Sequence, residues 1–130
     1  MKKQPEYLLQ CQICKYLEIQ HPKVLFMSDT IASLRLTIPQ QIRNKKIQKR
    51  DFKTPDLLIF EPKGKYHGLF IELKNESPFK KDGTIKASQN DHLLLQQKTL
   101  NKLMVKGYIA CFSWTFENTI ALINNYLKLN

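Results

Sequence analysis

The stretches Thr-Pro-Asp-Leu-Leu-Ile-Phe at 54–60 and Gly-Leu-Phe-Ile-Glu-Leu-Lys at 68–74 decide the fold of this chain. Each is a short apolar run, and turn-forming residues separate the two, so they predict an antiparallel hairpin. Asp56 stands at the start of the first run, and Glu72 and Lys74 lie inside the second. Unpaired charges in such strands are unfavourable, because burying even a neutral polar group costs roughly 2–7 kcal/mol. We therefore expect the three charges to converge on one point.

Strand alternation indicates where these charges point. One face of the second run is entirely apolar and suits a core: Leu69, Ile71 and Leu73. The other face begins with Phe70 and ends with Glu72 and Lys74, as expected for a strand that leaves the core and enters a cleft. Antiparallel pairing can bring Asp56 close to Glu72 at the same end of the sheet.

Two carboxylates beside a lysine suit a divalent-metal site. Mg²⁺ prefers oxygen ligands and usually takes one or two protein carboxylates while it keeps several waters. We expect Asp56, Glu72 and the backbone carbonyl of Leu73 to bind Mg²⁺ or Mn²⁺, which would polarise a phosphate and activate a water for attack on phosphorus. Lys74 would stabilise the transition state as an ammonium or, as a neutral amine, would take the proton of that water.

The rest of the chain predicts an α/β fold. Helical periodicity predicts helices at 5–20, 39–50, 89–106 and 116–129, and apolar runs predict strands at 24–27, 57–61, 68–74 and 108–113. Thr37 begins the second helix, Ser88 with Asp91 can cap the third, and Gly107 ends it. The order α-β-α-β-β-α-β-α fits a central mixed four-stranded sheet with helices on both faces. We expect residues 1–130 to form a single domain.

The charge of the chain favours a polyanionic partner. The chain has 21 Lys and Arg against 11 Asp and Glu, a net charge of +10, and nucleic acid is the commonest polyanion. Two segments are the expected phosphate-contacting surfaces: Arg43, Lys45, Lys46, Lys49, Arg50 and Lys53 before the hairpin, and Lys80 and Lys81 in a polar loop at 75–87. The first segment could also be only a solvated helix face. The length of the loop suits a mobile flap over DNA.

The cysteines and the hydropathy pattern indicate the cellular environment of the protein and whether it binds zinc. Cys11 and Cys14 are three apart in a predicted helix, so we expect them to pack in the core as reduced thiols rather than to bind zinc. No apolar run approaches the roughly 20 residues that span a bilayer, and no signal-peptide pattern follows the first residues. We therefore expect a cytoplasmic protein without a membrane partner.

The residues of the hairpin also resemble a nuclease signature. Pro55-Asp56 followed by Glu72-x-Lys74 matches the PD-(D/E)xK pattern. Along nearly all of its length the chain resembles the VRR-Nuc branch of that superfamily, the virus-type replication-repair nucleases of phages and bacteria. The segments that carry this resemblance are Glu6 and Gln10, Pro55 to Leu57, Gly68 to Lys74, Gln96, Gly107-Tyr108, and Ile123 with Tyr126-Leu127. The chain departs from the family in one place, because Phe52-Lys53-Thr54 stands where members commonly carry Gly.

The resemblance implies a restriction-endonuclease-like core and a Mg²⁺- or Mn²⁺-dependent DNA endonuclease, active as a stand-alone domain in a bacterial cell or a phage-infected host. It implies that Glu6 joins the metal ligands and that Gln96 orients the lysine or the phosphate, with Gln97 as the alternative one position away. Branched DNA, including four-way junctions, is the implied substrate. Cutting a junction needs two sites, which implies a homodimer.

Other interpretations of these residues stay open at the level of sequence. Glu72 and Lys74 could form a surface ion pair of little energetic value, and Glu6 could serve the helix dipole alone. Turn and helix-surface positions explain His67 and His92 without any role in a site. At the level of the whole chain, the rivals are a nuclease-like module that binds DNA without cutting it, and a scaffold for protein assembly.

Overall fold

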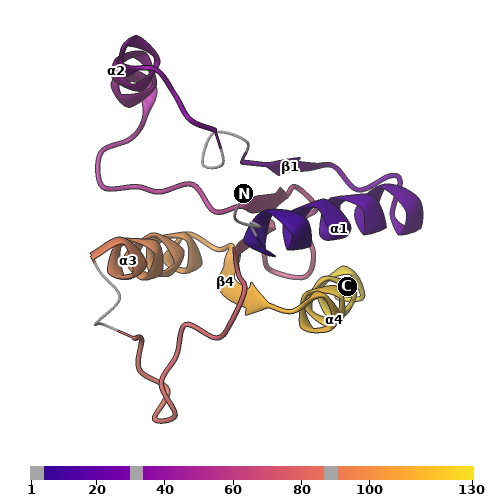
Figure 1. The fold of residues 1–130 in the computed structure, drawn as a ribbon. Coiled ribbons are helices and arrows are strands. Elements are labelled where there is room, and N and C mark those ends of the chain that lie inside the picture. The colour runs from indigo at the N-terminus through magenta and orange to yellow at the C-terminus, as the bar shows by residue number, and fades with distance from the viewer. Residues whose placement is uncertain (1–4, 30–33, 87–90) are drawn as a thin grey trace.

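The computed structural model describes residues 5–29, 34–86 and 91–130 (Figure 1). The elements, in order, are α1 (Pro5–Gln20), β1 (Phe26–Ser28), α2 (Ile38–Ile47), β2 (Leu57–Ile59), β3 (Leu69–Lys74), α3 (Asp91–Val105), β4 (Ile109–Trp114) and α4 (Phe116–Leu127). This confirms the predicted order α-β-α-β-β-α-β-α. The predicted cap residue Ser88 lies outside the described residues.

The four strands form one mixed sheet in the order β1-β2-β3-β4. β2 pairs antiparallel with β3, with Leu57 opposite Ile71, so the predicted hairpin is confirmed. β3 and β4 run parallel, with Glu72 opposite Phe112. A parallel pair needs a crossover connection, and α3 supplies it. β3 is therefore a central strand, and its carboxyl end carries the charged residues of the motif.

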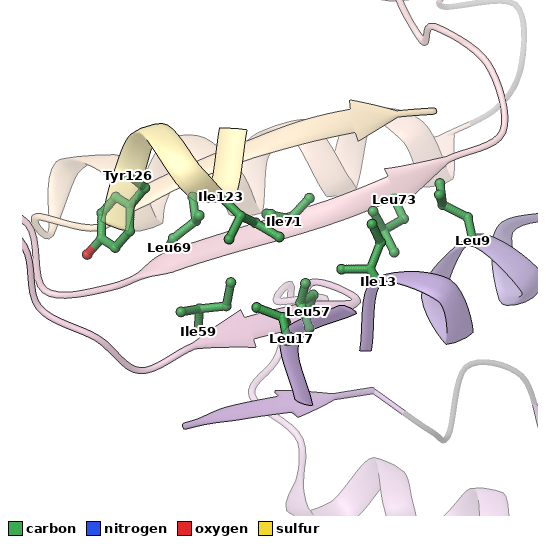
Figure 2. Close-up of a cluster of buried hydrophobic side chains, with 10 residues drawn as sticks. All are labelled: Leu9, Ile13, Leu17, Leu57, Ile59, Leu69, Ile71, Leu73, Ile123 and Tyr126. Atoms are coloured by element: carbon green, nitrogen blue, oxygen red, sulfur yellow. The ribbon is translucent and has the colours of Figure 1, made fainter. Parts of the chain in front are cut away.

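Helices cover both faces of this sheet, as Figure 1 shows for α1 and α4 against α3. On the face of α1 and α4 the buried side chains form one cluster, shown in Figure 2: Leu9, Ile13, Leu17, Leu57, Ile59, Leu69, Ile71, Leu73, Ile123 and Tyr126. The predicted apolar face of β3 lies entirely in this cluster. Its residues are almost completely removed from water, and burial of one such side chain stabilises the fold by about 1.5–3 kcal/mol.

The opposite face of the sheet packs against α3. Here Phe70 and Phe112 meet three leucines of the helix at helical spacing, in a cluster of Phe70, Leu93, Leu100, Leu103, Ala110 and Phe112. Helix α3 ends at Val105 and is followed by Gly107, whose φ of +97° only glycine adopts without strain and where a Cβ would lie 2.7 Å from the His67 ring. Because Gly107 also accepts the His67 N–H before β3 begins, α3 runs antiparallel to β3.

Helix α2 belongs to neither layer. Figure 1 shows it standing apart from the sheet, and none of its residues is buried. Its start is specified locally, because Thr37 and Gln40 form a capping box with reciprocal hydrogen bonds of 3.3 and 2.9 Å. We predicted a partly buried helix to residue 50, and both parts of that prediction are wrong: the helix ends at Ile47 and is exposed. Without packing, nothing extends the helix beyond its own hydrogen bonds.

The remaining differences from the predicted boundaries are small. The first strand is Phe26–Ser28 rather than 24–27, because its pairing partner in β2 sets its position. The last helix ends at Leu127, two residues earlier than predicted. Among the described residues, no helix has both the length and the apolar character that a membrane span requires.

Candidate active site

The site is built where β2 begins and β3 ends. The Asp56 side chain turns toward β3, and its Oδ2 accepts a hydrogen bond of 2.8 Å from the backbone N–H of Leu73. The N–H and C=O of one strand residue point to the same neighbouring strand. The carbonyl of Leu73 therefore points toward the Asp56 side as well. One carboxylate and one backbone oxygen thus share an edge of β3, beyond the last pair of the β2–β3 ladder.

Glu72 joins them from the face of the sheet that α3 covers. It is 2% exposed, far more buried than an isolated carboxylate tolerates. Burial, followed by a hydrogen bond from the Glu72 carboxyl to the Asp56 carboxylate and by repulsion between the two acids, raises the pKa of Glu72 to about 10, while Lys74 and Lys53 act in the opposite direction. The two acids are therefore in contact and share a proton in the absence of a cation. Such a pair favours a bound divalent cation.

Gln10 of α1 fixes the backbone from which Asp56 projects. Its Nε2 donates to the carbonyl of Asp56 at 3.1 Å and to that of Asp29 at 3.4 Å. The Asp56 carbonyl also accepts the backbone N–H of Asp29 at 2.9 Å. Gln10 is part of the resemblance described above, and its place in the structure is that of a support for Asp56.

Lys74 and Glu6 meet at a cleft at the carboxyl end of β3. The cleft has a volume of about 200 Å³, and α1 contributes Glu6 to it, β3 contributes Lys74, and α3 contributes His92 and Leu93. Lys74 is half-buried, with its Nζ 6.0 Å from the centroid of the Phe112 ring. The structure thus places Glu6 on the same cleft as Lys74.

Gln96 and Gln97 occupy different environments. Gln96 is 4% exposed on the side of α3 that faces the sheet, whereas Gln97 is partly exposed and donates to Asn101 Oδ1 at 3.0 Å. The Oε1 atom of Gln96 is buried without a hydrogen-bond partner among the described residues. A buried unpartnered acceptor costs about 1–3 kcal/mol. Gln96 therefore offers an acceptor for a donor that the folded chain does not itself supply.

Lys53 was predicted to contact phosphate on the surface, and in the structure it lies near the two acids of the site. Its backbone N–H donates to Oγ1 of Thr99 at 3.2 Å, which ties the chain before Asp56 to α3. Its charge acts on Glu72 and on His92. Lys53 thus supplies a second positive charge at the site, beside Lys74.

The other basic residues predicted to bind DNA lie on the outside of the molecule. Arg43, Lys45 and Lys46 are exposed on α2, and Lys49 and Arg50 are exposed just after it. Lys80 and Lys81 are exposed near the turn of the loop that follows β3.

The loop that follows β3, whose length suits a mobile flap over DNA, forms a small hairpin at its tip. Phe79 pairs with Ile85 across an isolated bridge, and Lys80 donates to the Thr84 carbonyl at 2.7 Å. Asp82 caps the turn by accepting from Thr84, and the Phe79 ring packs on Phe112. The segment is a small hairpin anchored on the core.

Sequence reasoning missed His92 and Thr99. His92 is exposed on the surface of α3, as expected, but it also lines the cleft, and its Nε2 lies 3.4 Å from Gln96 Nε2. Thr99 is 1% exposed and supports Lys53. Both follow the spacing of Gln96, four residues before it and three after it. A helical projection centred on Gln96 could have found them.

The cysteines differ from the expectation. Cys11 is exposed, so the prediction that both helix cysteines pack in the core is wrong for this one. Cys14 is half-buried, with its Sγ 2.9 Å from Ser28 Oγ, and burial raises its pKa. The two thiols differ because Cys11 lies on the side of α1 opposite the buried Leu9, Ile13 and Leu17, whereas Cys14 lies at the margin of that buried face.

The donor set at the site fits a hard divalent cation. Within the described residues no group of three or more His, Cys, Asp or Glu side chains is arranged to hold a metal ion. Mg²⁺ needs no such group, since one or two carboxylates and several waters are its usual shell. Asp56 and Glu72 supply two carboxylates, and Leu73 supplies a carbonyl on the same edge.

Comparison with known proteins bears on the fold. No protein-family model matches the chain, and no curated protein sequence matches it. A solved structure of a VRR_NUC domain protein is similar to it with a TM-score of 0.66 and 22% sequence identity, over 100% of this chain and 93% of that chain. The similarity runs through the whole arrangement of four helices and a mixed four-stranded sheet. The chain has the same fold as that VRR_NUC domain protein.

Proposed function

We propose that this chain is a divalent-metal-dependent DNA endonuclease that hydrolyses phosphodiester bonds. The observation that carries the proposal is the contact between two carboxyl groups, Asp56 and the buried Glu72, beside Lys74. A buried acid pair destabilises a fold, and a module that only bound DNA would gain nothing from acids that face phosphate.

The residues of the site have distinct roles in the proposed reaction. Asp56, Glu72 and the Leu73 carbonyl would hold Mg²⁺ or Mn²⁺, with Glu6 as a further ligand from α1. The cation, when bound, supplies Lewis-acid polarisation of the phosphate and a more acidic water. Lys74 stabilises the charge that develops on the phosphoryl oxygens. Gln96 Oε1, which has no partner among the described residues, would accept a hydrogen bond from Lys74 once the site holds its cation and substrate, and would so orient the lysine. No covalent enzyme intermediate is involved.

The basic residues outside the site would hold the DNA backbone. Lys53 lies at the site itself, while α2 with the residues after it, and the hairpin of Lys80 and Lys81, project from the body of the fold. Lysine and arginine on such surfaces bind phosphate without reading bases. We propose that branched DNA is the preferred substrate and that a homodimer cuts it, because a junction presents two strands to cut.

The proposal is tested with the purified chain on three DNA forms: supercoiled plasmid, linear duplex and a labelled four-way junction. Cleavage with Mg²⁺ or Mn²⁺ that EDTA abolishes is the expected result, and faster junction cutting would support branch selectivity. Salt-sensitive binding of all three forms without cleavage would instead favour the non-catalytic DNA-binding module.

A further inference from the structure

The contact between Gln96 and His92 has a consequence for the protonation of the imidazole. The nitrogen of an amide donates hydrogen bonds and does not accept them. It is the Gln96 Nε2 atom that lies 3.4 Å from His92 Nε2. His92 Nε2 must therefore be the acceptor, and the ring proton of the neutral imidazole must reside on Nδ1.

The position of the pair relates this contact to the site. His92 lines the cleft beside Lys74, near the start of α3, and α3 runs antiparallel to β3. Gln96, one turn further along, sits between Leu93 and Leu100 on the buried stripe of the helix. That stripe faces the side of the sheet on which Phe70 is followed by Glu72. Gln96 therefore lies at the level of the acid pair.

The amide of Gln96 has an acceptor oxygen and a donor nitrogen, so its orientation decides which of the two faces the site. With Nε2 toward His92, the acceptor Oε1 is turned into the buried space, where it has no partner among the described residues. With the amide reversed, Oε1 would accept from His92 and a donor would face the site instead. One contact thus selects between an acceptor and a donor beside Lys74.

We infer that His92 is a positioning residue: its unprotonated Nε2 accepts a hydrogen bond from Gln96 and thereby presents Gln96 Oε1 to the site. The surroundings of the ring agree with a neutral imidazole. Burial, followed by the charges of Lys53 and Lys74, lowers the pKa of His92, and Asp56 opposes them. An imidazolium would donate from both nitrogens and would repel the amide nitrogen.

The tautomer can be measured without DNA, metal or activity. Proton–nitrogen correlation NMR on the full chain labelled with ¹⁵N distinguishes Nδ1–H from Nε2–H in each histidine. His21 is an internal reference, because its Nε2 lies 3.0 Å from Asn124 Oδ1, an acceptor, and must carry the proton. The inference predicts Nδ1–H for His92 and Nε2–H for His21. It also predicts that Gln96→Leu removes the preference of His92 for Nδ1–H. Nε2–H at His92 in the unsubstituted chain would overturn the inference.

A kinetic measurement extends the test and rests on the proposed nuclease activity. His92→Leu lacks the acceptor and should lower kcat about tenfold with little change in KM, as loss of a supporting partner does. His92→Gln restores an acceptor and should recover most of that loss. The double variant His92→Leu/Gln96→Leu should be no slower than Gln96→Leu alone, because both substitutions remove the same interaction between His92 and Gln96. Additive losses would overturn the positioning role. If the unsubstituted chain cuts no DNA, the proposed function fails while the NMR result still decides the tautomer.

Discussion

The Asp56 carboxylate accepts a hydrogen bond of 2.8 Å from the backbone N–H of Leu73, at the point where the β2–β3 ladder ends. The bond substitutes a side chain for the next strand residue, and it places an acid at the edge of β3 where Glu72 can touch it. The Asp56 carboxylate therefore both extends the β2–β3 pairing and forms part of the site. Asp56 contributes to stability and to the proposed catalysis, and suitable substitutions can separate the two contributions.

Asp56→Asn keeps an oxygen that can accept from Leu73, whereas Asp56→Ala leaves that N–H without a partner. We expect Asp56→Ala to be less stable than Asp56→Asn by about 1–3 kcal/mol, the penalty of an unsatisfied buried donor. Both should lose cleavage by at least about a hundredfold, because several kcal/mol of charge stabilisation depend on the metal ligand. Urea unfolding and plasmid cleavage measure the two effects. Equal stability of the two variants would show that the Leu73 bond contributes nothing.

The raised pKa of Glu72 predicts how the metal-free protein responds to pH. Its folded value is about 10 against an ordinary 4.5, so between these values the folded state holds the proton more tightly than the unfolded state. Stability conferred by that proton is fully present below about pH 4.5 and is lost as the pH rises toward 10. Thermal unfolding in EDTA should therefore give a falling Tm from pH 7 to pH 9.

Two comparisons isolate this contribution of Glu72. In Glu72→Gln the decline of Tm between pH 7 and pH 9 should be clearly shallower, because the group that loses the proton is gone. Added Mg²⁺ or Mn²⁺ should raise the Tm of the unsubstituted protein more at pH 9 than at pH 7, since the cation replaces the proton. The same slope in both proteins would contradict the shared acid pair.

Thr99 supports Lys53 from within α3. Thr99→Val keeps the volume but removes the acceptor for the Lys53 N–H, so we expect a loss of about 1–3 kcal/mol in stability. It should also weaken DNA binding, because Lys53 is no longer held beside the acids. Thr119→Val is the matched control: Thr119 is equally buried and bonds Ser113 at 2.7 Å, in α4. It should lower stability and leave DNA affinity unchanged, and a similar loss of affinity in both would refute the role of Thr99.

Salt dependence tests where the DNA lies. Each phosphate contact adds about 0.9 to the slope of log affinity against log salt concentration on duplex DNA. Replacing Arg43, Lys46 and Lys80 by alanine should lower the magnitude of the slope by up to about 2.7. The matched control replaces Lys23, Lys63 and Lys128, which line a separate pocket beside α4 and remove the same charge. If the control variant lowers the slope as much, net charge alone drives binding and the two projecting surfaces have no special part.

Much of this fold follows from local pattern. The alternation in Leu69 to Lys74 separates the core face of β3 from the face that carries Glu72, and the structure confirms both the hairpin and the mixed sheet. These features are predictable because strand period and turn chemistry act over a few residues. The order of elements follows from the same short-range signals.

Other features depend on packing that no local pattern encodes. The end of α2 was misplaced because its basic residues suit a helix, while the contacts that would extend it are lacking. His92 and Thr99 share a side of α3 with Gln96, a helical spacing that the sequence contains, but what each contacts depends on how α3 packs on the sheet. Cys11, by contrast, was misplaced although the pattern shows its position, because the spacing of Leu9, Ile13 and Leu17 puts Cys11 on the opposite side of α1. A helix face in general can be predicted, but its exact margin is set by the neighbouring elements.

The most direct test of the account is cleavage of supercoiled plasmid by the unsubstituted chain and by Lys74→Ala, each with Mg²⁺ or Mn²⁺ and with EDTA. Lys128→Ala, an exposed lysine that lines a separate pocket, controls for the loss of one positive charge. The account predicts metal-dependent cutting that is lost in Lys74→Ala and retained in Lys128→Ala. Cutting that persists in Lys74→Ala, or DNA binding without any cutting by the unsubstituted chain, would contradict it.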